Sequence, residues 1–278
     1  MNPKQSLGVI GAPIAHSLSP LLHGSLIAKY DFPFTYSAFH VENDMLAEAI
    51  YGAQALGFRG LNVTVPYKKA VLPLLDEIDE FALKVGAVNT ILFSDGKITG
   101  YNTDVFGFLH SLAVENVSLA DRDVIVLGAG GAARAIVLAA KNARANSVRI
   151  YNRTYEKAVA LAEKTGSTVL PEDALKSIPD NAAVINTTSV GMHPHVGESP
   201  FPARLFRPDC VYIDIVYNPQ NTLFLQHAAT VGALSVGGIG MLILQGILAM
   251  EIWSGKKIDI QDNFVALRDL LVQALWSH

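Results

Sequence analysis

Residues 124–133, Val-Ile-Val-Leu-Gly-Ala-Gly-Gly-Ala-Ala, decide the fold of this chain, because a glycine turn joins an apolar strand to a helix-forming segment there. Gly128 permits the tight turn, Gly130 lets backbone N–H groups approach a pyrophosphate, and Ala133 keeps the helix close to the strand. The helix N-terminus adds partial positive charge for the same anion. With a second strand expected at residues 147–151, the stretch predicts a Rossmann dinucleotide site. The alternative is a tight turn that binds nothing.

The end of that second strand indicates which dinucleotide is bound. An NAD site usually places an acid there, about twenty residues after the glycines. This chain instead reads Asn152-Arg153-Thr154-Tyr155-Glu156-Lys157. If Thr154 caps the following helix, Lys157 lies in the first turn, where a cation opposes the helix dipole unless an anion is bound. Arg153 offers a planar fork to a phosphate, so the pattern predicts NADP rather than NAD.

Two polar clusters close strand-like runs earlier in the chain. Residues 62–68, Asn-Val-Thr-Val-Pro-Tyr-Lys, end in a proline turn that delivers Lys68 at the edge of a sheet. Residues 101–104, Tyr-Asn-Thr-Asp, supply the carboxylate that a catalytic amine needs. A solvated lysine at a helix start is the alternative for Lys68. The second cluster favours a catalytic pair of Lys68 and Asp104.

Composition limits the classes of protein that remain. The 278 residues are half apolar, which is enough for about two domains. A net charge of −4 without a basic run argues against nucleic acid. Cys210 is the only cysteine, so we expect no disulfide, no cysteine metal cage, a buried position for Cys210 and a cytoplasmic protein. Residues 1–10 lack a signal-peptide pattern, and the apolar run 239–253 is too short to span a membrane, so a buried helix is expected there.

Strands and helices are expected to alternate along the chain. In the first part we expect strands at 7–10, 34–41 and 60–65, helices from Ser19-Pro20 and at 44–56, 68–75 and 80–85, and a hairpin of 88–93 with 97–101. In the second part we expect strands near residues 124, 148, 169, 183 and 211, and helices at 132–143, 155–164 and 223–231. The last helices, 240–253 and 260–276, have no further strands to serve and are expected to cover the first domain.

This alternation predicts an α/β protein of two domains. The first is a discontinuous N-terminal α/β substrate domain with a mainly parallel sheet, residues 1–104 plus 238–278. The second is a Rossmann NADP-binding domain, residues 105–237.

The motifs, in their order along nearly the whole chain, resemble those of the shikimate dehydrogenase family. The matching segments are residues 10–20 (Ile-Gly-Ala-Pro-Ile-Ala-His-Ser-Leu-Ser-Pro), 62–68, 86–90, 100–104, 128–133, 152–154, 186–192, 214–219 and 238–242 with Gln245. Lys157 departs from the family pattern, in which arginine is common. The resemblance implies NADPH-dependent reduction of 3-dehydroshikimate in chorismate and aromatic amino acid biosynthesis, with a small-molecule substrate and no metal.

The resemblance also implies site residues. The shikimate carboxylate would be held by Ser17, Ser19 and Tyr217, and the ring hydroxyls by Thr64, Lys68, Asn89, Asp104 and Gln245. The cofactor would be bound by Gly128, Ala129, Gly130, Gly131, Ala132, Asn152, Arg153, Thr154, Lys157, Thr188, Ile215 and Gly238.

Several alternatives stay open at this level. Ser19 can serve only as a helix cap, Asn89 only as a turn pin, and Gln245 only as a partner for a buried backbone group. At the level of function, the alternatives are a quinate/shikimate dehydrogenase that uses NAD and a non-catalytic NADP-sensing protein. A homodimer is compatible with the sequence, which does not decide it.

Overall fold

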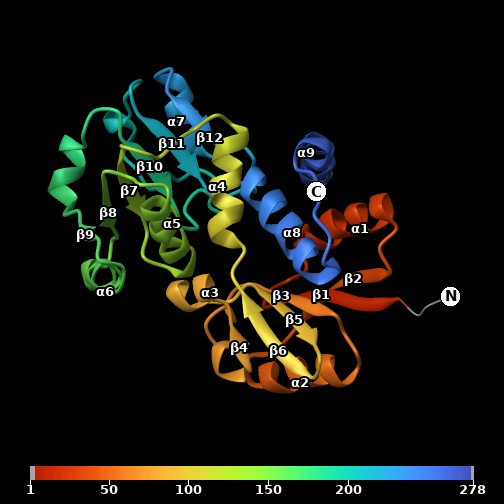
Figure 1. The fold of residues 1–278 in the computed structure, drawn as a ribbon. Coiled ribbons are helices and arrows are strands. Elements are labelled where there is room, and N and C mark those ends of the chain that lie inside the picture. Colours follow the sequence, from red (N-terminus) through yellow and green to blue (C-terminus); the bar gives the residue numbers. More distant parts are fainter. Residues whose placement is uncertain (1–3, 277–278) are drawn as a thin grey trace. The chain divides into compact units, whose positions relative to one another are not determined.

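The structure is a computed structural model that describes residues 4–276. Residues 1–3 and 277–278, which the expected domain ranges and the N-terminal segment 1–10 include, lie outside the described residues. The chain divides into two compact units, one of residues 1–103 and 243–271 and the other of residues 104–242 and 272–278. Each unit is built around its own sheet (Figure 1). The functions assigned to the two expected domains stay predictions at this point.

The first unit contains a six-stranded sheet in the order β2-β1-β3-β5-β6-β4. The strands are β1 (Gln5–Gly11), β2 (Phe34–His40), β3 (Gly60–Val63), β4 (Glu77–Ile78), β5 (Thr90–Ser94) and β6 (Lys97–Tyr101). Parallel pairing joins β1 to β2 and β3, and β4 to β6, whereas β5 is antiparallel to both of its neighbours. The expected hairpin is confirmed as β5 and β6, with Asp95 and Gly96 at positive φ in its turn.

Helices cover both faces of this sheet. The early ones are α1 (Ser19–Tyr30), the short helix η1 (Asn43–Met45), α2 (Leu46–Ala55), η2 (Leu72–Leu74) and α3 (Glu80–Val85). Figure 1 shows α2 on the side of the sheet opposite to α1. Leu46 and Ile50 of α2 pack in one apolar core with Leu61, Val63 and Ile91 of the sheet. The face of β3 that carries Asn62 therefore looks toward α1, since alternate strand residues point to opposite faces.

The expected helix over 68–75 is wrong. That segment forms hydrogen-bonded turns and only the single turn of η2. Pro73 accounts for this, because its ring removes an amide donor, clashes with the preceding helical turn and disfavours helical geometry at Leu72. Asp79 does start the next helix as expected of a cap, with its carboxylate accepting from Phe81 N–H at 3.0 Å.

Most of the last two helices, α8 (Ile239–Ser254) and α9 (Gln261–Trp276), belongs to the first unit, which takes in residues 243–271. The Trp253 indole N–H donates to the Ile91 carbonyl at 2.9 Å. A Cβ on Gly60 would lie 2.0 Å from the same indole nitrogen, so the close approach of α8 to the sheet requires glycine at this position. On α9, the Asn263 side-chain amide donates to the Tyr30 hydroxyl at 2.7 Å.

The second unit has a parallel six-stranded sheet in the order β12-β11-β10-β7-β8-β9. Its strands are β7 (Asp123–Leu127), β8 (Ser147–Tyr151), β9 (Thr168–Val169), β10 (Ala183–Asn186), β11 (Val211–Asp214) and β12 (Leu234–Val236). This is the strand order of a Rossmann fold, which confirms the fold class. Five of these strands are predicted from the sequence. The sixth, β12, is not; it is an edge strand of three residues whose first side chain, Leu234, is exposed.

The helices of this unit are α4 (Asp104–Val114), α5 (Gly131–Asn142), α6 (Tyr155–Thr165), η3 (Glu172–Ser177), η4 (Ala203–Leu205) and α7 (Leu223–Thr230). Gly166 ends α6 at a φ of 60°, the left-handed conformation that suits glycine. Phe206, Tyr212 and Phe224 form an aromatic cluster in the core beneath α7. Cys210 lies in the same core, as expected.

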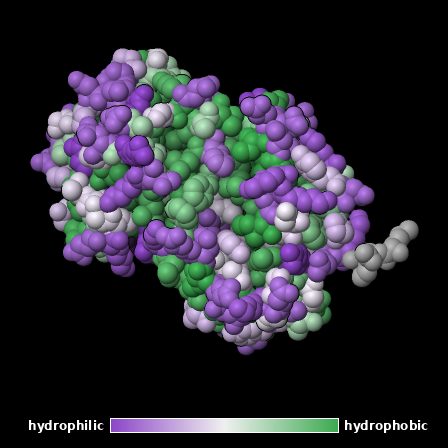
Figure 2. Space-filling model, viewed as in Figure 1, coloured by the Kyte–Doolittle hydropathy of each residue, from purple (hydrophilic) through white to green (hydrophobic). Residues whose placement is uncertain are grey.

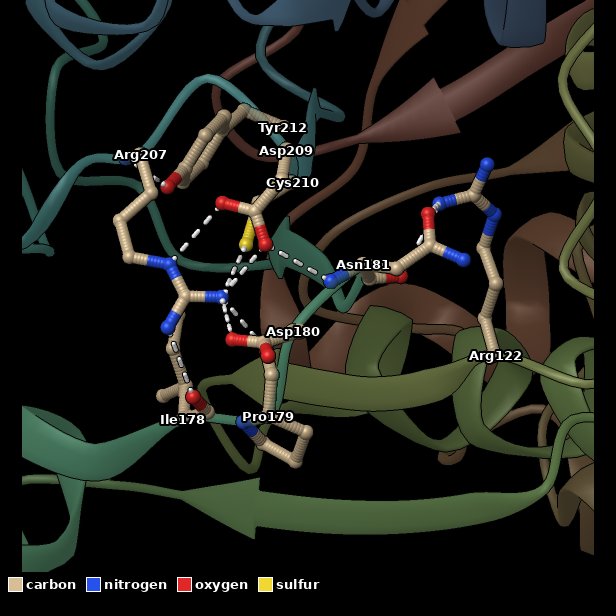
Figure 3. A network of polar contacts seen from close by, with 9 residues as sticks. All are labelled: Arg122, Ile178, Pro179, Asp180, Asn181, Arg207, Asp209, Cys210 and Tyr212. Carbon is tan, nitrogen blue, oxygen red and sulfur yellow. Dashed lines mark hydrogen bonds and ion pairs between the residues drawn. The ribbon is translucent and has the colours of Figure 1, made fainter.

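Arg207 joins the segments that lead into β10 and β11 (Figure 3). Its guanidinium donates to the Ile178 and Pro179 carbonyls, both at 3.1 Å, and pairs with Asp180 and Asp209 at 3.0 and 2.7 Å. Hydrogen bonding to Arg207 lowers the pKa of Asp209 to about 2. One planar fork therefore holds two carbonyls and two acids at the amino ends of neighbouring strands.

Replacing Arg207 with alanine is expected to lower the Tm of the protein by about 4 °C, because the carbonyls at 178 and 179 lose a charged donor. Much of the network is solvent-exposed, which keeps the loss modest. Differential scanning calorimetry measures the shift, with Arg204→Ala, an exposed cation three residues earlier, as the control. An equal Tm for the two variants would show that the Arg207 contacts contribute nothing.

The surface shows where the polar residues lie. Figure 2 shows hydrophilic side chains interspersed with apolar ones over the face in view. Among the described residues, no helix has both the length and the apolar character needed to cross a bilayer. The apolar run 239–253 is a largely buried helix, as expected.

Candidate active site

Lys68 lies in a turn whose backbone is fixed at the end of β3. Thr64 N–H donates to the Ile10 carbonyl at 3.0 Å, and the Thr64 carbonyl accepts from Tyr67 N–H at 2.9 Å. The Lys68 carbonyl accepts from Val88 N–H at 2.7 Å. Thr64 and Lys68 are half-buried. The flexible side chain of Lys68 thus starts from an anchored main chain next to the segment that leads into β5.

Asn89 joins that segment to the loop that follows β6. Its side-chain oxygen accepts from Thr103 N–H at 2.8 Å, and its amide nitrogen donates to Thr103 Oγ1 at 2.9 Å. Thr103 Oγ1 in turn donates to Gln245 Oε1 of α8 at 3.5 Å. Asp104 follows directly as the first residue of α4 and is buried. Asn89, Thr103 and Gln245 are therefore brought together, and Gln245 meets a side chain rather than only a backbone group.

The opening loop departs from the expected helix cap. Ser19 is the first residue of α1, and Leu18 precedes it in the capping position. Ser17 Oγ accepts from Ser19 N–H at 3.3 Å. The reading of Ser19 as the helix cap is therefore wrong, because Ser17 satisfies one of the amides left open at the start of the helix. Both serine side chains are half-buried.

Asn62 and Tyr36 join this cluster although the motifs did not single them out as site residues. The Tyr36 hydroxyl donates to Asn62 Oδ1 at 2.7 Å, and Asn62 is buried. A polar residue between Leu61 and Val63 in an apolar strand is a signal that sequence reasoning can use. Tyr36 carries no such signal, because its partner lies 26 residues away in the chain.

The glycine turn of the second unit has the geometry that its sequence predicts. Gly128 has a φ of +113°, and a Cβ there would lie 2.7 Å from Thr187 Oγ1, so glycine is required on both counts. Gly130 precedes α5 in the N-cap position and Gly131 begins the helix. A Cβ on Gly130 or Gly131 would meet no atom of the described residues within 4 Å. The turn thus offers open space at a helix N-terminus, which fits a phosphate group.

The neighbouring turn after β8 carries the predicted phosphate ligands. Asn152 donates from its side-chain amide to the Thr154 carbonyl at 2.8 Å, which shapes the turn. Thr154 is the N-cap residue of α6, as expected, although its hydroxyl makes no capping bond within the described chain. Lys157 lies in the first turn of that helix, and Arg153 and Lys157 are exposed. Ala129 and Ala132 stand within and just after the glycine turn, and both are half-buried.

Thr188 and Ile215 follow the ends of β10 and β11. A Cβ on Gly128 would approach Thr188 Cγ2 to 2.9 Å, so Thr188 borders the glycine turn. A Cβ on Gly238 would lie 2.3 Å from the Ile215 carbonyl oxygen, so the two backbones meet and only glycine fits. Tyr217 is half-buried, and burial raises the pKa of its phenol, which stays a neutral donor.

The Asp214 carboxylate accepts hydrogen bonds from the segments that carry these residues. It is buried, and its carboxylate accepts from the Asn186 amide at 2.9 Å, from Val216 N–H at 3.0 Å and from the Thr222 hydroxyl at 2.7 Å. Asn186 Oδ1 accepts from Thr188 N–H at 2.9 Å. The motif pattern did not single out Asp214 as a site residue, because its partners come from three separate segments. Burial outweighs the three donors and raises its pKa from 3.8 to about 6.

This raised pKa makes a prediction about pH. Asp214 binds a proton more tightly in the folded protein than in the unfolded chain. Protonation of Asp214 therefore stabilises the fold. This contribution is fully present below pH 3.8 and is lost as the pH rises through about 6. The free energy of unfolding of the wild type, minus that of Asp214→Asn, is expected to fall by about 2 kcal/mol between pH 4 and pH 7. Urea unfolding at several pH values measures it, with Glu163→Gln, an exposed acid, as control. A difference that rises with pH would show that the donors outweigh burial.

Within residues 4–276, the His, Cys, Asp and Glu side chains form no group of three or more that suits a metal ion. The chemical inventory consists instead of a lysine on an anchored main chain, a cluster of hydroxyls and amides, and open space at a helix N-terminus. Hydroxyls and amides can donate to a carboxylate and can read hydroxyl groups as donors and acceptors. This inventory suits a polar cyclic substrate and a phosphorylated cofactor.

Comparison with known proteins defines the family. A family model described as "Shikimate dehydrogenase substrate binding domain" matches residues 9–91, and one described as "Shikimate / quinate 5-dehydrogenase" matches residues 111–222. The NADP(+) shikimate dehydrogenase of Geobacillus kaustophilus is 41% identical over 273 residues, which cover 96% of this chain and 98% of that protein. This chain belongs to the shikimate dehydrogenase family.

Solved structures agree with this membership. A shikimate dehydrogenase crystallised in complex with NADP+ matches with a TM-score of 0.91 at 36% identity, covering 98% of this chain and 96% of that one. The Thermus thermophilus shikimate 5-dehydrogenase, crystallised with NADP(H) and shikimate, matches with a TM-score of 0.88 at 35% identity, covering 96% and 99%. The fold expected for a shikimate dehydrogenase is therefore confirmed across both units.

Proposed function

We propose that this chain is an NADP-dependent shikimate dehydrogenase, an oxidoreductase that acts on a CH–OH group. It interconverts shikimate and 3-dehydroshikimate in chorismate and aromatic amino acid biosynthesis. The observation that carries this proposal is the anchored Lys68 turn beside the Asn89–Thr103 cluster in a member of this family. An amine held by its main chain among hydroxyl and amide groups is what proton transfer to a ring oxygen requires.

The proposed chemistry assigns the proton to Lys68. Bound NADP supplies the hydride exchange with the carbon that carries the reacting oxygen. In the reducing direction Lys68 gives its proton to that oxygen, and in the oxidising direction it takes the proton back. Asp104, buried at the start of α4, is the acid that we assign to orienting the amine. The hydrogen bond from Val88 N–H to the Lys68 carbonyl fixes the main chain from which the Lys68 side chain extends.

The substrate contacts that we propose follow the polar groups described above. Thr64, Asn89 and Gln245 would read the ring hydroxyls, together with Lys68 and Asp104. Ser17, Ser19 and Tyr217 would hold the carboxylate through neutral donors. Support for these assignments comes from the half-buried position of Ser17 and Ser19 and from the bonds that join Asn89, Thr103 and Gln245.

The cofactor contacts rest on how the residues fit a dinucleotide. The open space over Gly130 and Gly131 would take the pyrophosphate at the start of α5. Arg153 and Lys157 would bind the 2′-phosphate, with Asn152 and Thr154 shaping their turn. The remaining residues that we assign to cofactor binding are Gly128, Ala129, Ala132, Thr188, Ile215 and Gly238.

We assign substrate binding and catalysis to residues 1–104 with 238–278, and dinucleotide binding to residues 105–237. A reducing compartment such as the cytoplasm is proposed because Cys210 is the only cysteine, so the chain can form no internal disulfide.

We also propose a homodimer. Its support is β2, an edge strand of the first sheet whose residues 34–39 carry no charge, whereas edge strands usually carry charges that block further pairing. Light scattering is expected to give about twice the chain mass of 29.8 kDa. A mass equal to that of one chain would contradict the dimer.

Thermal stability in the presence of ligands tests the proposed function through binding rather than through rate. NADP⁺ is expected to raise the Tm, and shikimate added at saturating NADP⁺ is expected to raise it further, because each ligand binds only the folded protein. If NADP⁺ alone gives the full shift and shikimate adds nothing, the chain is an NADP sensor rather than a dehydrogenase of shikimate.

A further inference from the structure

The orientation of the Asn62 amide fixes the direction of a hydrogen-bond chain in the first unit. Asn62 Nδ2 donates to the Asn89 carbonyl at 3.2 Å and to Thr90 Oγ1 at 3.1 Å. A backbone carbonyl can only accept, so the nitrogen of this amide must face it and the oxygen must face Tyr36. The Tyr36 hydroxyl, at 2.7 Å from that oxygen, is therefore the donor.

A second backbone group fixes the far end of the chain. Thr103 N–H can only donate, so the oxygen of the Asn89 amide must face it, at 2.8 Å. The Asn89 nitrogen then donates to Thr103 Oγ1 at 2.9 Å, and Thr103 passes its own proton to Gln245 Oε1. Thr90 Oγ1, which accepts from Asn62, gives its proton to Asn89 Oδ1 at 3.1 Å. The side-chain donors of this hydrogen-bond series all point from Tyr36 toward Gln245.

Ser19 meets the first member of the chain. Burial raises the pKa of Tyr36, and a hydrogen bond with Ser19 acts in the opposite direction. A bond that favours the phenolate is one in which Ser19 donates. This agrees with the geometry, because the single proton of Tyr36 is already given to Asn62. Ser19 is therefore a polar neighbour of the Tyr36 hydroxyl.

Aromatic packing holds Tyr36 in this position. The His23 ring stacks on it with centroids 4.3 Å apart and planes 18° apart, and Trp253 lies 6.1 Å from it. His23 is fully buried, and burial lowers its pKa to about 3 against a smaller opposite effect of Asn62. A neutral imidazole therefore acts here as an aromatic wall that restricts the Tyr36 ring.

We propose that Tyr36 is a positioning residue of the shikimate site. Its hydroxyl satisfies the buried oxygen of Asn62, and the Asn62 nitrogen in turn holds the Asn89 carbonyl and Thr90, in the segment that carries the Asn89 side chain assigned to the ring hydroxyls. This inference rests on the proposed function. It predicts that loss of one hydroxyl weakens shikimate binding through residues that remain in place.

The test is Tyr36→Phe, which keeps the stacked ring and removes only the donor. The KM for shikimate is expected to rise about tenfold, because the buried Asn62 Oδ1 loses its donor and Asn62 holds the segment of Asn89 less firmly. The kcat and the KM for NADP⁺ are expected to stay within about threefold. The matched control is Tyr30→Phe, which removes a hydroxyl at the end of α1 that accepts from Asn263 at 2.7 Å. That control is expected to lower the Tm without changing the KM for shikimate.

A lower Tm with an unchanged KM for shikimate would reduce Tyr36 to a structural residue and overturn the proposal. If Tyr36→Phe does not fold, Thr90→Val interrupts the same series of hydrogen bonds after Asn62, with little change of side-chain volume. An unchanged KM for shikimate in Thr90→Val would also overturn the proposal. Turnover of shikimate by the wild type is measured first. If the wild type turns over shikimate and Tyr36→Phe has the same KM for shikimate, this inference alone is overturned. If the wild type is inactive, the proposed function is overturned as well.

Discussion

Replacing Lys68 with alanine is expected to lower kcat for shikimate oxidation at least a hundredfold while the Kd for NADPH changes little. Hydride transfer leaves the reacting oxygen in need of a proton exchange, and a positioned acid–base group contributes about two to four powers of ten to the rate. The Lys68 carbonyl, rather than its side chain, makes the bond to Val88 N–H, so alanine preserves the turn. Steady-state kinetics gives kcat, and fluorescence titration with NADPH gives the affinity for the cofactor.

The next residue provides a matched control for this substitution. Lys69 is exposed, and Lys69→Ala removes the same charge from the same turn, so it is expected to leave kcat within about twofold. If the two variants lose activity equally, the effect is one of local charge. If Lys68→Ala loses kcat and cofactor affinity to the same degree, Lys68 is a binding residue and the acid–base assignment is wrong.

Replacing Arg153 with alanine is expected to raise the KM for NADP⁺ about 10- to 100-fold and to leave the KM for NAD⁺ nearly unchanged. Arg153 is exposed in the turn between β8 and α6, where a guanidinium can bind a phosphate through two parallel bonds. Each hydrogen bond to a charged group contributes about 1.5–3 kcal/mol. Lys157 remains in the first turn of α6, so binding of NADP⁺ is weakened rather than abolished.

Lys164→Ala is the control for this prediction, because it removes an exposed cation from the last turn of the same helix. It is expected to leave both KM values unchanged. Kinetics with NADP⁺ and NAD⁺ for each variant gives the ratio of kcat/KM between the two cofactors. A parallel loss with both cofactors would mean that Arg153 supports the fold of the turn, and the 2′-phosphate would need another partner.

The parts of the fold that are predictable from sequence are those that short-range patterns determine. The glycine turn at Gly128 depends on a strand before it and a helix after it, and the structure supplies both, with the positive φ that glycine allows. The helix predicted over 68–75, which the structure does not contain, had a local signal against it, since Pro73 breaks helical geometry. By contrast, β12 is a three-residue edge strand that pairs only with β11, and so short a run has no periodicity to detect.

The candidate site is less predictable, because its geometry comes from pairs that are far apart in sequence. Tyr36 meets Asn62 across 26 residues, and Asn186 meets Asp214 across 28. The motif residues Lys68, Asn89 and Gln245 are identifiable as chemistry, but the bonds that orient them depend on strand order and on the return of α8 to the first unit. Ser19 shows the same limit, since local rules assigned the cap to Ser19 whereas Leu18 holds the N-cap position and Ser17 accepts from Ser19 N–H.

The most direct test of the account follows NADPH absorbance while shikimate and quinate are each offered with NADP⁺ and with NAD⁺, and Lys68→Ala serves as the control. The account predicts strong turnover for shikimate with NADP⁺ that is lost in the control. Preference for quinate with NAD⁺ would favour a quinate/shikimate dehydrogenase. No turnover with any pair, despite tight binding of NADP⁺, would contradict the assignment of Lys68 and Asp104 and would make the chain an NADP sensor.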